Sequence, residues 1–310
     1  MTLIALEEHY VDENLLRYLG APSNALTERM RLGHSSRLED MDAAGISMQV
    51  LSHAPPGLQA VPDQDAVALC RDVNDRLHGF IADNSARFAA FSSLPTTHPR
   101  AAAEELERTV TKLGFKGAMI NGSTNGEYLD DRKYWPILEA AEALNVPIYL
   151  HPADLPSDAK RALIGDYART HPMFAAAAWG FTVDAGTHAL RLALSGAFDR
   201  FPRLRIILGH LGEGLPFLLD RIDESLARNT PMKNFASVFR THFYITTSGF
   251  FSDHALACSI AQLGEDKILF SVDWPYADNH AAAAWIRKAP LNSETRKLIA
   301  GDTARTLLTF

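Results

Sequence analysis

Cysteine is nearly absent from this sequence of 310 residues, and the two that occur, Cys70 and Cys258, lie far apart without a C-x-x-C spacing. Neither a disulfide framework nor a thiolate metal site is therefore indicated. Runs of lysine and arginine are also missing, and the formal net charge is −7. Because nucleic acids and anionic membranes need a basic surface, the sequence favours a small molecule as its partner.

Long apolar runs are lacking as well, since no stretch approaches the roughly 20 residues of a membrane span. Glu7, Glu8 and His9 stand where a signal peptide would need its apolar stretch. We therefore expect a cytoplasmic protein with no membrane partner. No low-complexity linker or shift in composition divides the chain, so the sequence predicts a single domain that spans residues 1–310.

Short apolar runs rich in strand-forming residues are present, and they alternate with longer amphipathic segments. The eight runs cover residues 2–7, 47–51, 88–93, 117–121, 147–151, 205–210, 243–248 and 268–273. Residues 63–85, 98–113 and 130–145 repeat apolar side chains at three- to four-residue spacing, which predicts helices. Alternating strands and helices imply parallel strands, and a closed barrel needs eight of them. We therefore predict an α/β protein with a (β/α)₈ TIM barrel.

Two long stretches, 10–36 and 152–172, follow the first and fifth predicted strands and carry no regular pattern. Both belong to connections that lead from a strand to the next helix. Because α/β barrels keep their active sites on that side, we expect these irregular segments to border the functional site.

Polar residues able to bind a metal ion stand at the ends of several predicted strands. Glu7 and His9 close the first strand two residues apart, so both side chains can project from one face. His151 ends strand five, His210 ends strand six and Asp273 ends strand eight. Each alone has a simpler interpretation, as a hydrogen-bonded structural histidine or a helix-capping carboxylate. Together, at the ends of four strands, they indicate a site for one divalent ion, zinc or manganese.

Seven segments carry a resemblance that extends over nearly the whole chain: ALEEH (5–9), RLEDMDAAGI (37–46), GFKGAMIN (114–121), YLHP (149–152), ALRLALSGAFDRFPRLRIILGHLGEGLPF (189–217), ITTSG (245–249) and ILFSVDWPY (268–276). In these segments the sequence resembles the amidohydrolase superfamily. Within it, the chain is similar to the metal-dependent branch that contains γ-resorcylate, 2,3-dihydroxybenzoate and 5-carboxyvanillate decarboxylases. The resemblance implies a TIM barrel with one divalent metal ion and no organic cofactor.

The resemblance also implies roles for individual residues. Four positions match the metal ligands: Glu7, His9, His151 and Asp273. His210 and Glu213 match a neighbouring pair that contacts the substrate or bound water. Asn121 and Arg221 match substrate-contacting positions. Because Arg221 resembles a residue that reaches into a neighbouring subunit's pocket, we expect a homodimer or homotetramer; an ordinary exposed arginine on a helix is the alternative.

Some features depart from the wider superfamily. Many of its hydrolases open with His-x-His and hold a second ion through a modified lysine on strand four, whereas this chain has Glu-x-His and ends strand four in Asn121. A binuclear site is therefore disfavoured. Some decarboxylases of the branch have alanine where His9 stands, so His9 is either a ligand or a close neighbour of the ligands.

Other candidates remain open between function and packing. Tyr276 is a candidate for binding a flat substrate, together with Trp179 and Phe181 as an aromatic wall, and core packing is the alternative. His53, after strand two, could line the mouth or be a solvated loop residue. His188, in a segment predicted to be helical, is a candidate either to support the metal site or to pack against the core.

The reaction implied is the non-oxidative loss of CO₂ from an ortho-hydroxybenzoate, a carboxy-lyase activity. Asp273 would donate a proton to the ring carbon that bears the carboxylate, while His210 and Glu213 orient the departing group. The alternative is a mononuclear metal-dependent hydrolase of a lactone or amide, in which Asp273 accepts a proton from the attacking water. Through the family resemblance alone, Glu7 in place of the first histidine favours decarboxylation. A non-catalytic binder has no need of an aspartate and a His/Glu pair around a metal.

Overall fold

The computed structural model describes residues 1–21, 24–33, 35–229 and 234–310, and the eight predicted strands are present in it. They are β1 (Ile4–Tyr10), β2 (Met48–His53), β3 (Phe88–Ala90), β4 (Ala118–Asn121), β5 (Ile148–His151), β6 (Ile206–Leu208), β7 (Phe243–Thr246) and β8 (Ile268–Leu269). Consecutive strands pair in parallel, in one sheet of order β1-β2-β3 and another of order β4-β5-β6-β7-β8.

Backbone hydrogen bonds join the two sheets at both seams, as the closure of a barrel requires. Between β1 and the segment after β8, the amide of His9 donates to the carbonyl of Trp274 over 2.8 Å. Between the segment after β3 and the start of β4, the amide of Ser92 donates to the carbonyl of Gly117, also over 2.8 Å. Both seams run parallel. The predicted TIM-barrel class is confirmed.

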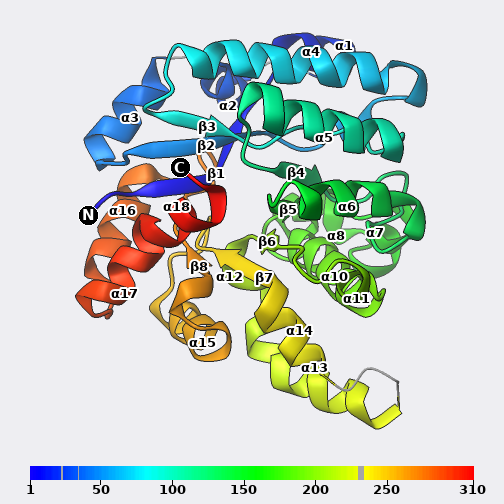
Figure 1. Cartoon of the computed structure of the whole chain (residues 1–310), viewed down its shortest axis with the longest axis vertical. Coiled ribbons are helices and arrows are strands. Elements are labelled where there is room, and N and C mark those ends of the chain that lie inside the picture. The colour runs from blue at the N-terminus through cyan, green and yellow to red at the C-terminus, as the bar shows by residue number, and fades with distance from the viewer. Residues whose placement is uncertain (22–23, 34, 230–233) are drawn as a thin grey trace.

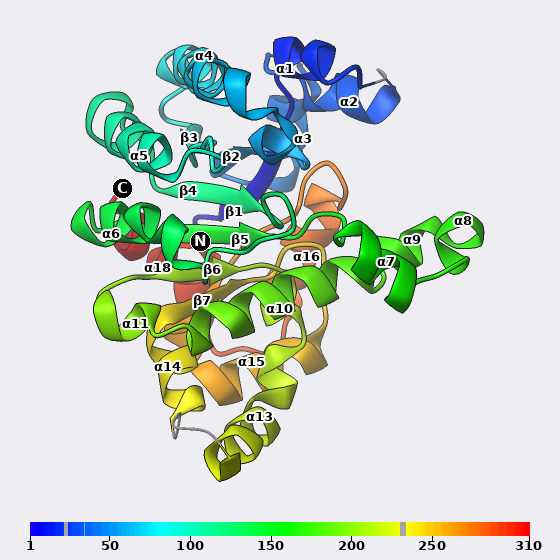
Figure 2. The same ribbon diagram turned by 90° about the vertical axis from the view of Figure 1, so that its right-hand side faces the viewer.

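Helices cover the outside of the strands (Figures 1 and 2). The longer ones are α3 (Ser36–Ala44), α4 (Asp63–Ala82), α5 (Pro99–Leu113), α6 (Trp135–Ala143), α10 (Gly180–Leu194), α13 (Leu215–Asn229), α14 (Phe235–His242), α15 (Asp253–Leu263) and α16 (Asn279–Lys288). The shorter ones are α1 (Glu13–Tyr18), α2 (Ala25–Met30), α7 (Ser157–Leu163), α8 (Tyr167–Thr170), α9 (Pro172–Ala175), α11 (Ala197–Arg200), α12 (His210–Glu213), α17 (Ser293–Lys297) and α18 (Thr303–Leu308). Single turns of 3₁₀ or π helix cover Gly57–Ala60, Arg132–Tyr134, Glu265–Lys267 and Leu298–Asp302.

The helix predicted over 130–145 is shorter than expected. Pro136 lies in the first turn of α6, where a missing N–H costs nothing, so the α-helix begins at Trp135 after a 3₁₀ turn. The expectation that 10–36 and 152–172 are irregular was wrong, because they contain α1, α2, α7 and α8. Asp12 and Asn24 cap the first two of these helices with their side chains. Residues 22, 23 and 34 of the first stretch lie outside the described residues.

The barrel interior holds its own apolar cluster, separate from the larger core between strands and helices. Seven strands contribute a buried residue to it: Ile4, Val50, Ala89, Met119, Tyr149, Ile207 and Leu269. Leu307 and Leu308 of α18 pack onto this cluster, and α18 lies beside the start of β1 near both ends of the chain (Figure 1). The interior is thus covered at the amino ends of the strands, which leaves the carboxyl ends as the mouth.

None of the helices in the described ranges has the length and apolar character that crossing a membrane requires. Cys70 and Cys258 are both free thiols.

Candidate metal centre

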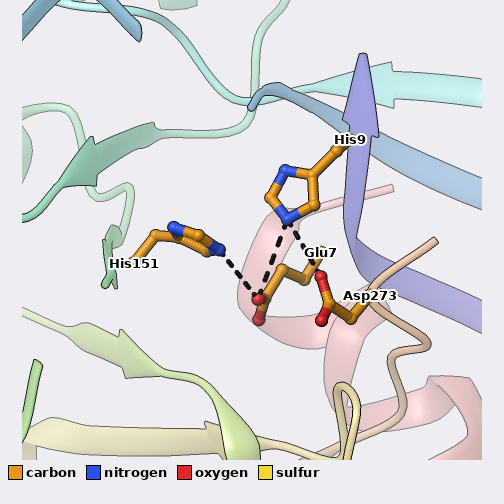
Figure 3. Close-up of side chains that lie close together, drawn as sticks. All are labelled: Glu7, His9, His151 and Asp273. Atoms are coloured by element: carbon orange, nitrogen blue, oxygen red, sulfur yellow. Dashed lines mark ion pairs between the residues drawn. The ribbon is translucent and has the colours of Figure 1, made fainter. Parts of the chain in front are cut away.

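A β-bulge in β1 sets the direction of the first two candidate ligands. The register of β1 against β2 shifts between Ala5 and Glu8. The shift spans Leu6 and Glu7: Ile4 and Leu6 belong to the cluster inside the barrel, whereas Glu7 and His9 point toward His151 and Asp273 (Figure 3). Bulges beside functional sites commonly redirect side chains in this way. Glu7 and His9 therefore share a face, as predicted, although they lie within β1 rather than at its end.

The structure brings together the four residues predicted as metal ligands. One donor atom each from Glu7, His9, His151 and Asp273 lies within 4.8 Å of the other three (Figure 3). Nε2 of His151 is 3.2 Å from Oε1 of Glu7, and Nε2 of His9 is 3.1 Å from Oδ1 of Asp273. The side chains of Glu7 and His9 are fully buried, whereas that of Asp273 is 16% exposed and borders the mouth.

This donor set fits a divalent cation. Oε1 of Glu7 is buried and accepts no hydrogen bond from the described residues. An unpartnered buried carboxylate oxygen is costly, and a cation between the four donors would satisfy it. Two imidazole nitrogens and two carboxylates suit zinc or manganese. His9 faces the same point as the other three, which favours direct ligation over a supporting role.

Charges within the site shift its titration. Burial by itself raises the pKa of Glu7, but the imidazoles of His210, His151 and His9 together lower it well below its usual range. Burial lowers the pKa of His9 and so favours the neutral imidazole, the form that binds metals. Burial also acts to lower the pKa of His210, but the Glu213 and Glu7 carboxylates raise it well above its usual range.

A left-handed turn after β6 presents the predicted His210/Glu213 pair. His210, Leu211 and Glu213 have φ angles of 50°, 52° and 53°, and the two glycines of the turn have φ angles of 81° and 73°. Residues with side chains rarely adopt this conformation, which costs about 1–3 kcal/mol each and is concentrated at functional sites. Nδ1 of His210 consequently lies 2.6 Å from Oε1 of Glu213. Thr182 of α10 holds the other oxygen of Glu213 over 2.8 Å.

His210 and Asp273 lie beyond the ends of their strands, which corrects the predicted boundaries. β6 ends at Leu208 and β8 ends at Leu269, so strands six and eight are shorter than predicted. Asp273, like His210, has a left-handed backbone, with a φ of 73°. Nε2 of His210 lies 3.8 Å from Oδ2 of Asp273 and 3.6 Å from Oε1 of Glu7. The imidazole therefore stands next to the four-residue group.

Glu8 is an important residue that the sequence did not single out. It is fully buried on the face of β1 opposite to its neighbours. Oε1 accepts the backbone N–H of Val272 over 2.9 Å, and Oε2 accepts that of Trp274 over 3.2 Å. These two amides flank Asp273, so Glu8 fixes the segment that carries this candidate ligand. The pair of adjacent glutamates, Glu7 and Glu8, was the one sequence signal for a role of Glu8. An exposed glutamate on the outer face of a strand would give the same sequence pattern.

The three candidate substrate-binding residues differ in their placement. Asn121 ends β4 beside His151 of β5, and its buried Oδ1 has no hydrogen-bond partner in the described ranges. The ring of Tyr276 lies 5.6 Å from that of His9, and half of the residue is exposed at the mouth. Arg221 is exposed on α13 and forms no ion pair with any described residue. Within one chain, the structure does not bring Arg221 into the site.

The remaining open candidates have other surroundings. His53 is buried at the end of β2 and accepts the N–H of Asp12 over 3.0 Å, so it is a structural residue rather than a solvated one. His188 of α10 accepts the backbone N–H of Leu129 over 3.1 Å. This contact agrees with the packing role rather than with support of the metal site. Trp179 is 49% exposed, so core packing does not explain it.

Comparison with known proteins agrees with this fold and site. The profile of the Amidohydrolase family matches residues 11–310, and the chain belongs to that family. Within it, the chain is similar to decarboxylases. It is 40% identical to the γ-resorcylate decarboxylase of Rhizobium sp. (strain MTP-10005) over 98% of this chain and 97% of that one. The predicted decarboxylase branch is thus confirmed.

Two solved structures support the same placement. A dihydroxybenzoic acid decarboxylase from Polaromonas sp. JS666, with bound manganese and the inhibitor 2-nitroresorcinol, superposes with a TM-score of 0.90 at 37% identity, over 99% of this chain and 97% of that one. A 2,6-dihydroxybenzoate decarboxylase in complex with 2,6-dihydroxybenzoate gives a TM-score of 0.92 at 36% identity and covers both chains fully. The predicted metal dependence agrees with the manganese in the first of these relatives.

Proposed function

We propose that this protein is a metal-dependent carboxy-lyase that removes CO₂ from an ortho-hydroxybenzoate without oxidation, with 2,6-dihydroxybenzoate (γ-resorcylate) as its first candidate substrate. Residues 1–310 then form one catalytic barrel domain. The observation that carries the proposal is the group of Glu7, His9, His151 and Asp273 beside His210 at the mouth of a barrel whose relatives are decarboxylases. A dihydroxybenzoate with another substitution pattern is the nearest alternative.

The proposed ligands hold one divalent ion, which we assign as manganese. When bound, this ion supplies positive charge that stabilises the phenolate and carboxylate oxygens of the substrate. Glu7, His9 and His151 are nearly or fully buried and define the floor of the site, while Asp273 and His210 are 16% and 22% exposed and face the incoming ring. His210, held by Glu213, orients the substrate carboxylate. Asn121 and Tyr276 bind the ring's other substituents.

Asp273 moves the proton in the proposed reaction. Its carboxylate takes the phenolic proton as the substrate binds and then gives it to the ring carbon that bears the carboxylate. The bond between that carbon and the carboxylate breaks, its electron pair returns to the ring, and CO₂ leaves. The phenolate product takes a proton from water on release. No oxidant, reductant or organic cofactor is needed.

Arg221 enters the proposal through a second subunit. Its guanidinium is exposed on α13, and a planar guanidinium suits paired hydrogen bonds to an anionic substrate. We propose a homodimer or homotetramer in which Arg221 serves a neighbouring site. We propose the cytoplasm as its location. The two cysteines are free thiols, which suits a reducing compartment.

An ultraviolet screen of hydroxybenzoates with manganese-loaded protein tests the proposal. We expect turnover of 2,6-dihydroxybenzoate or another ortho-hydroxy acid, and none of benzoate, which lacks the phenolic proton that Asp273 must receive. Lactones and amides belong in the same screen, because the alternative hydrolase would use the same residues. Equal turnover of benzoate would contradict the role of the ortho-hydroxyl group.

A further inference from the structure

We infer that three hydroxyl groups inside the barrel, on Tyr149, Thr246 and Ser248, form a hydrogen-bonded chain that positions Glu7 for the metal ion. Tyr149 lies on the inner face of β5, and its hydroxyl donates to Oε2 of Glu7. The same hydroxyl lies 2.7 Å from Oγ1 of Thr246, which lies 2.9 Å from Oγ of Ser248. Ser248 in turn accepts the backbone N–H of His210 over 3.1 Å. The inference rests on the proposed ligand set, in which Glu7 binds the ion.

The two ends of this chain fix the direction of every hydrogen bond in it. The amide of His210 can only donate, and a carboxylate can only accept. Each hydroxyl has one proton, so Ser248 must donate to Thr246, Thr246 to Tyr149, and Tyr149 to Glu7. Hydrogen bonds that all point one way polarise and strengthen one another in a dry interior. All three hydroxyl-bearing residues are fully buried.

Because of the hydroxyl chain, the two carboxylate oxygens of Glu7 have different surroundings. Oε2 is held by Tyr149 from below, whereas Oε1 faces Nε2 of His151 at 3.2 Å and Nε2 of His9 at 3.9 Å. Oε1 accepts no hydrogen bond from the described residues. Tyr149 therefore fixes the plane of the carboxylate and leaves one oxygen for the ion. Partners behind a ligand commonly set its orientation in this way.

Gly209 supplies independent support for a site built around this chain. A Cβ atom placed there would lie 2.9 Å from Oε2 of Glu7, and 3.3 Å from both the Ser248 and the Tyr149 hydroxyl oxygens. The φ of Gly209 is −71°, which any residue adopts, so its conformation does not require glycine. A Cβ there would instead crowd Oε2 of Glu7 and the two hydroxyl groups, so glycine leaves room for the hydroxyl chain.

The chain also connects the metal ligand to the strained turn after β6. His210 is the first residue of that turn, and its backbone N–H is the donor at the start of the hydroxyl chain. Tyr149, Thr246 and Ser248 are fully buried, so their hydroxyl groups are not exposed at the mouth. They are positioning residues, which act through Glu7 and the backbone of His210.

Tyr149→Phe tests the inference, because it removes one hydroxyl and keeps the ring. We expect the affinity of the metal-free protein for Mn²⁺, measured by competition with a chelator, to fall about 10- to 100-fold. The electron paramagnetic resonance spectrum of the bound Mn²⁺ should change as well. Tyr134→Phe is the matched control: Tyr134 is also buried, but within the described residues the hydrogen bonds of its hydroxyl, to Thr124 and Glu127, are both 3.5 Å long. This control should keep its affinity within about twofold of the wild type.

Ser248→Ala is a second test, because it removes the hydroxyl group of the chain that lies farthest from Glu7. We expect it to weaken Mn²⁺ binding in the wild-type background and to have no further effect beside Tyr149→Phe, because the chain is already broken. Wild-type affinity in Tyr149→Phe, or fully additive losses in the double variant, would overturn the inference. If His151→Ala abolishes Mn²⁺ binding while Tyr149→Phe retains it, the ligand set stands and only the hydroxyl chain fails.

Discussion

Glu8→Gln tests how the barrel holds Asp273. Each group that is hydrogen-bonded to the Glu8 side chain donates to its carboxylate. Besides the amides of Val272 and Trp274, the hydroxyl of Ser271 donates to Oε1 and the Nε2 group of Gln49 donates to Oε2, each over 3.2 Å. The amide of Gln49 cannot turn around freely, since its Oε1 accepts from the buried Arg37 over 3.2 Å. Whichever way the new glutamine is placed, its NH₂ group faces donors, and at least one buried N–H loses its acceptor.

The cost of this change follows from the unsatisfied group. A buried donor without a partner costs about 1–3 kcal/mol. With an unfolding entropy of roughly 2.1 cal/mol/K per residue, a chain of 310 residues should lose about 2–5 °C in Tm. Differential scanning calorimetry measures this loss. Because the affected amides flank Asp273, the affinity for Mn²⁺ should also fall.

Glu104→Gln is the matched control, since Glu104 is exposed on α5. A surface change of this kind should stay within about 0.5 kcal/mol of the wild type. If Glu8→Gln melts together with the control and binds Mn²⁺ as the wild type does, then Glu8 does not hold the Asp273 segment and the reasoning is refuted.

Substitutions at the mouth test the individual side chains. His151→Ala removes one proposed imidazole ligand and should leave the protein with less than one divalent ion per chain by elemental analysis; a full equivalent at wild-type affinity contradicts the proposed ligand set. Asp273→Asn should lower kcat by at least the roughly 10²–10⁴-fold that general acid–base catalysis supplies, in steady-state assays, and near-normal turnover would exclude Asp273 as the proton donor. Arg221→Ala should raise KM for the anionic substrate in an oligomer, whereas a fully active monomer in sedimentation rules out the shared site.

The sequence predicted the barrel because its signals are local and repeated. Each of the eight strands is an apolar run bounded by a turn or helix, and each was found in its place. The lengths of β6 and β8 were overestimated. The residues directly after Leu208 and Leu269 are still small or apolar, although the backbone leaves the sheet there. Apolar character reports burial, and burial continues beyond the hydrogen-bonded strand.

The site could be predicted only in part. Alternation along β1 placed Glu7 and His9 on one face, but it could not reveal the bulge that turns this face inward after Leu6. The left-handed turn at His210 was equally hidden, because residues with side chains seldom adopt positive φ and no local pattern marks them. Tyr149 reads as an ordinary strand residue. Its contact with Glu7 spans 142 positions of sequence and arises only when the barrel closes.

Decarboxylation of 2,6-dihydroxybenzoate in D₂O by the manganese-loaded wild-type protein tests the central claim most directly. The proposed proton transfer from Asp273 requires one solvent deuterium at the ring carbon that lost CO₂, observed by mass spectrometry and proton NMR, with none placed there in enzyme-free controls. Release of no CO₂ from any ortho-hydroxybenzoate, together with efficient opening of a lactone or cleavage of an amide, would contradict the decarboxylase and leave only the metal site.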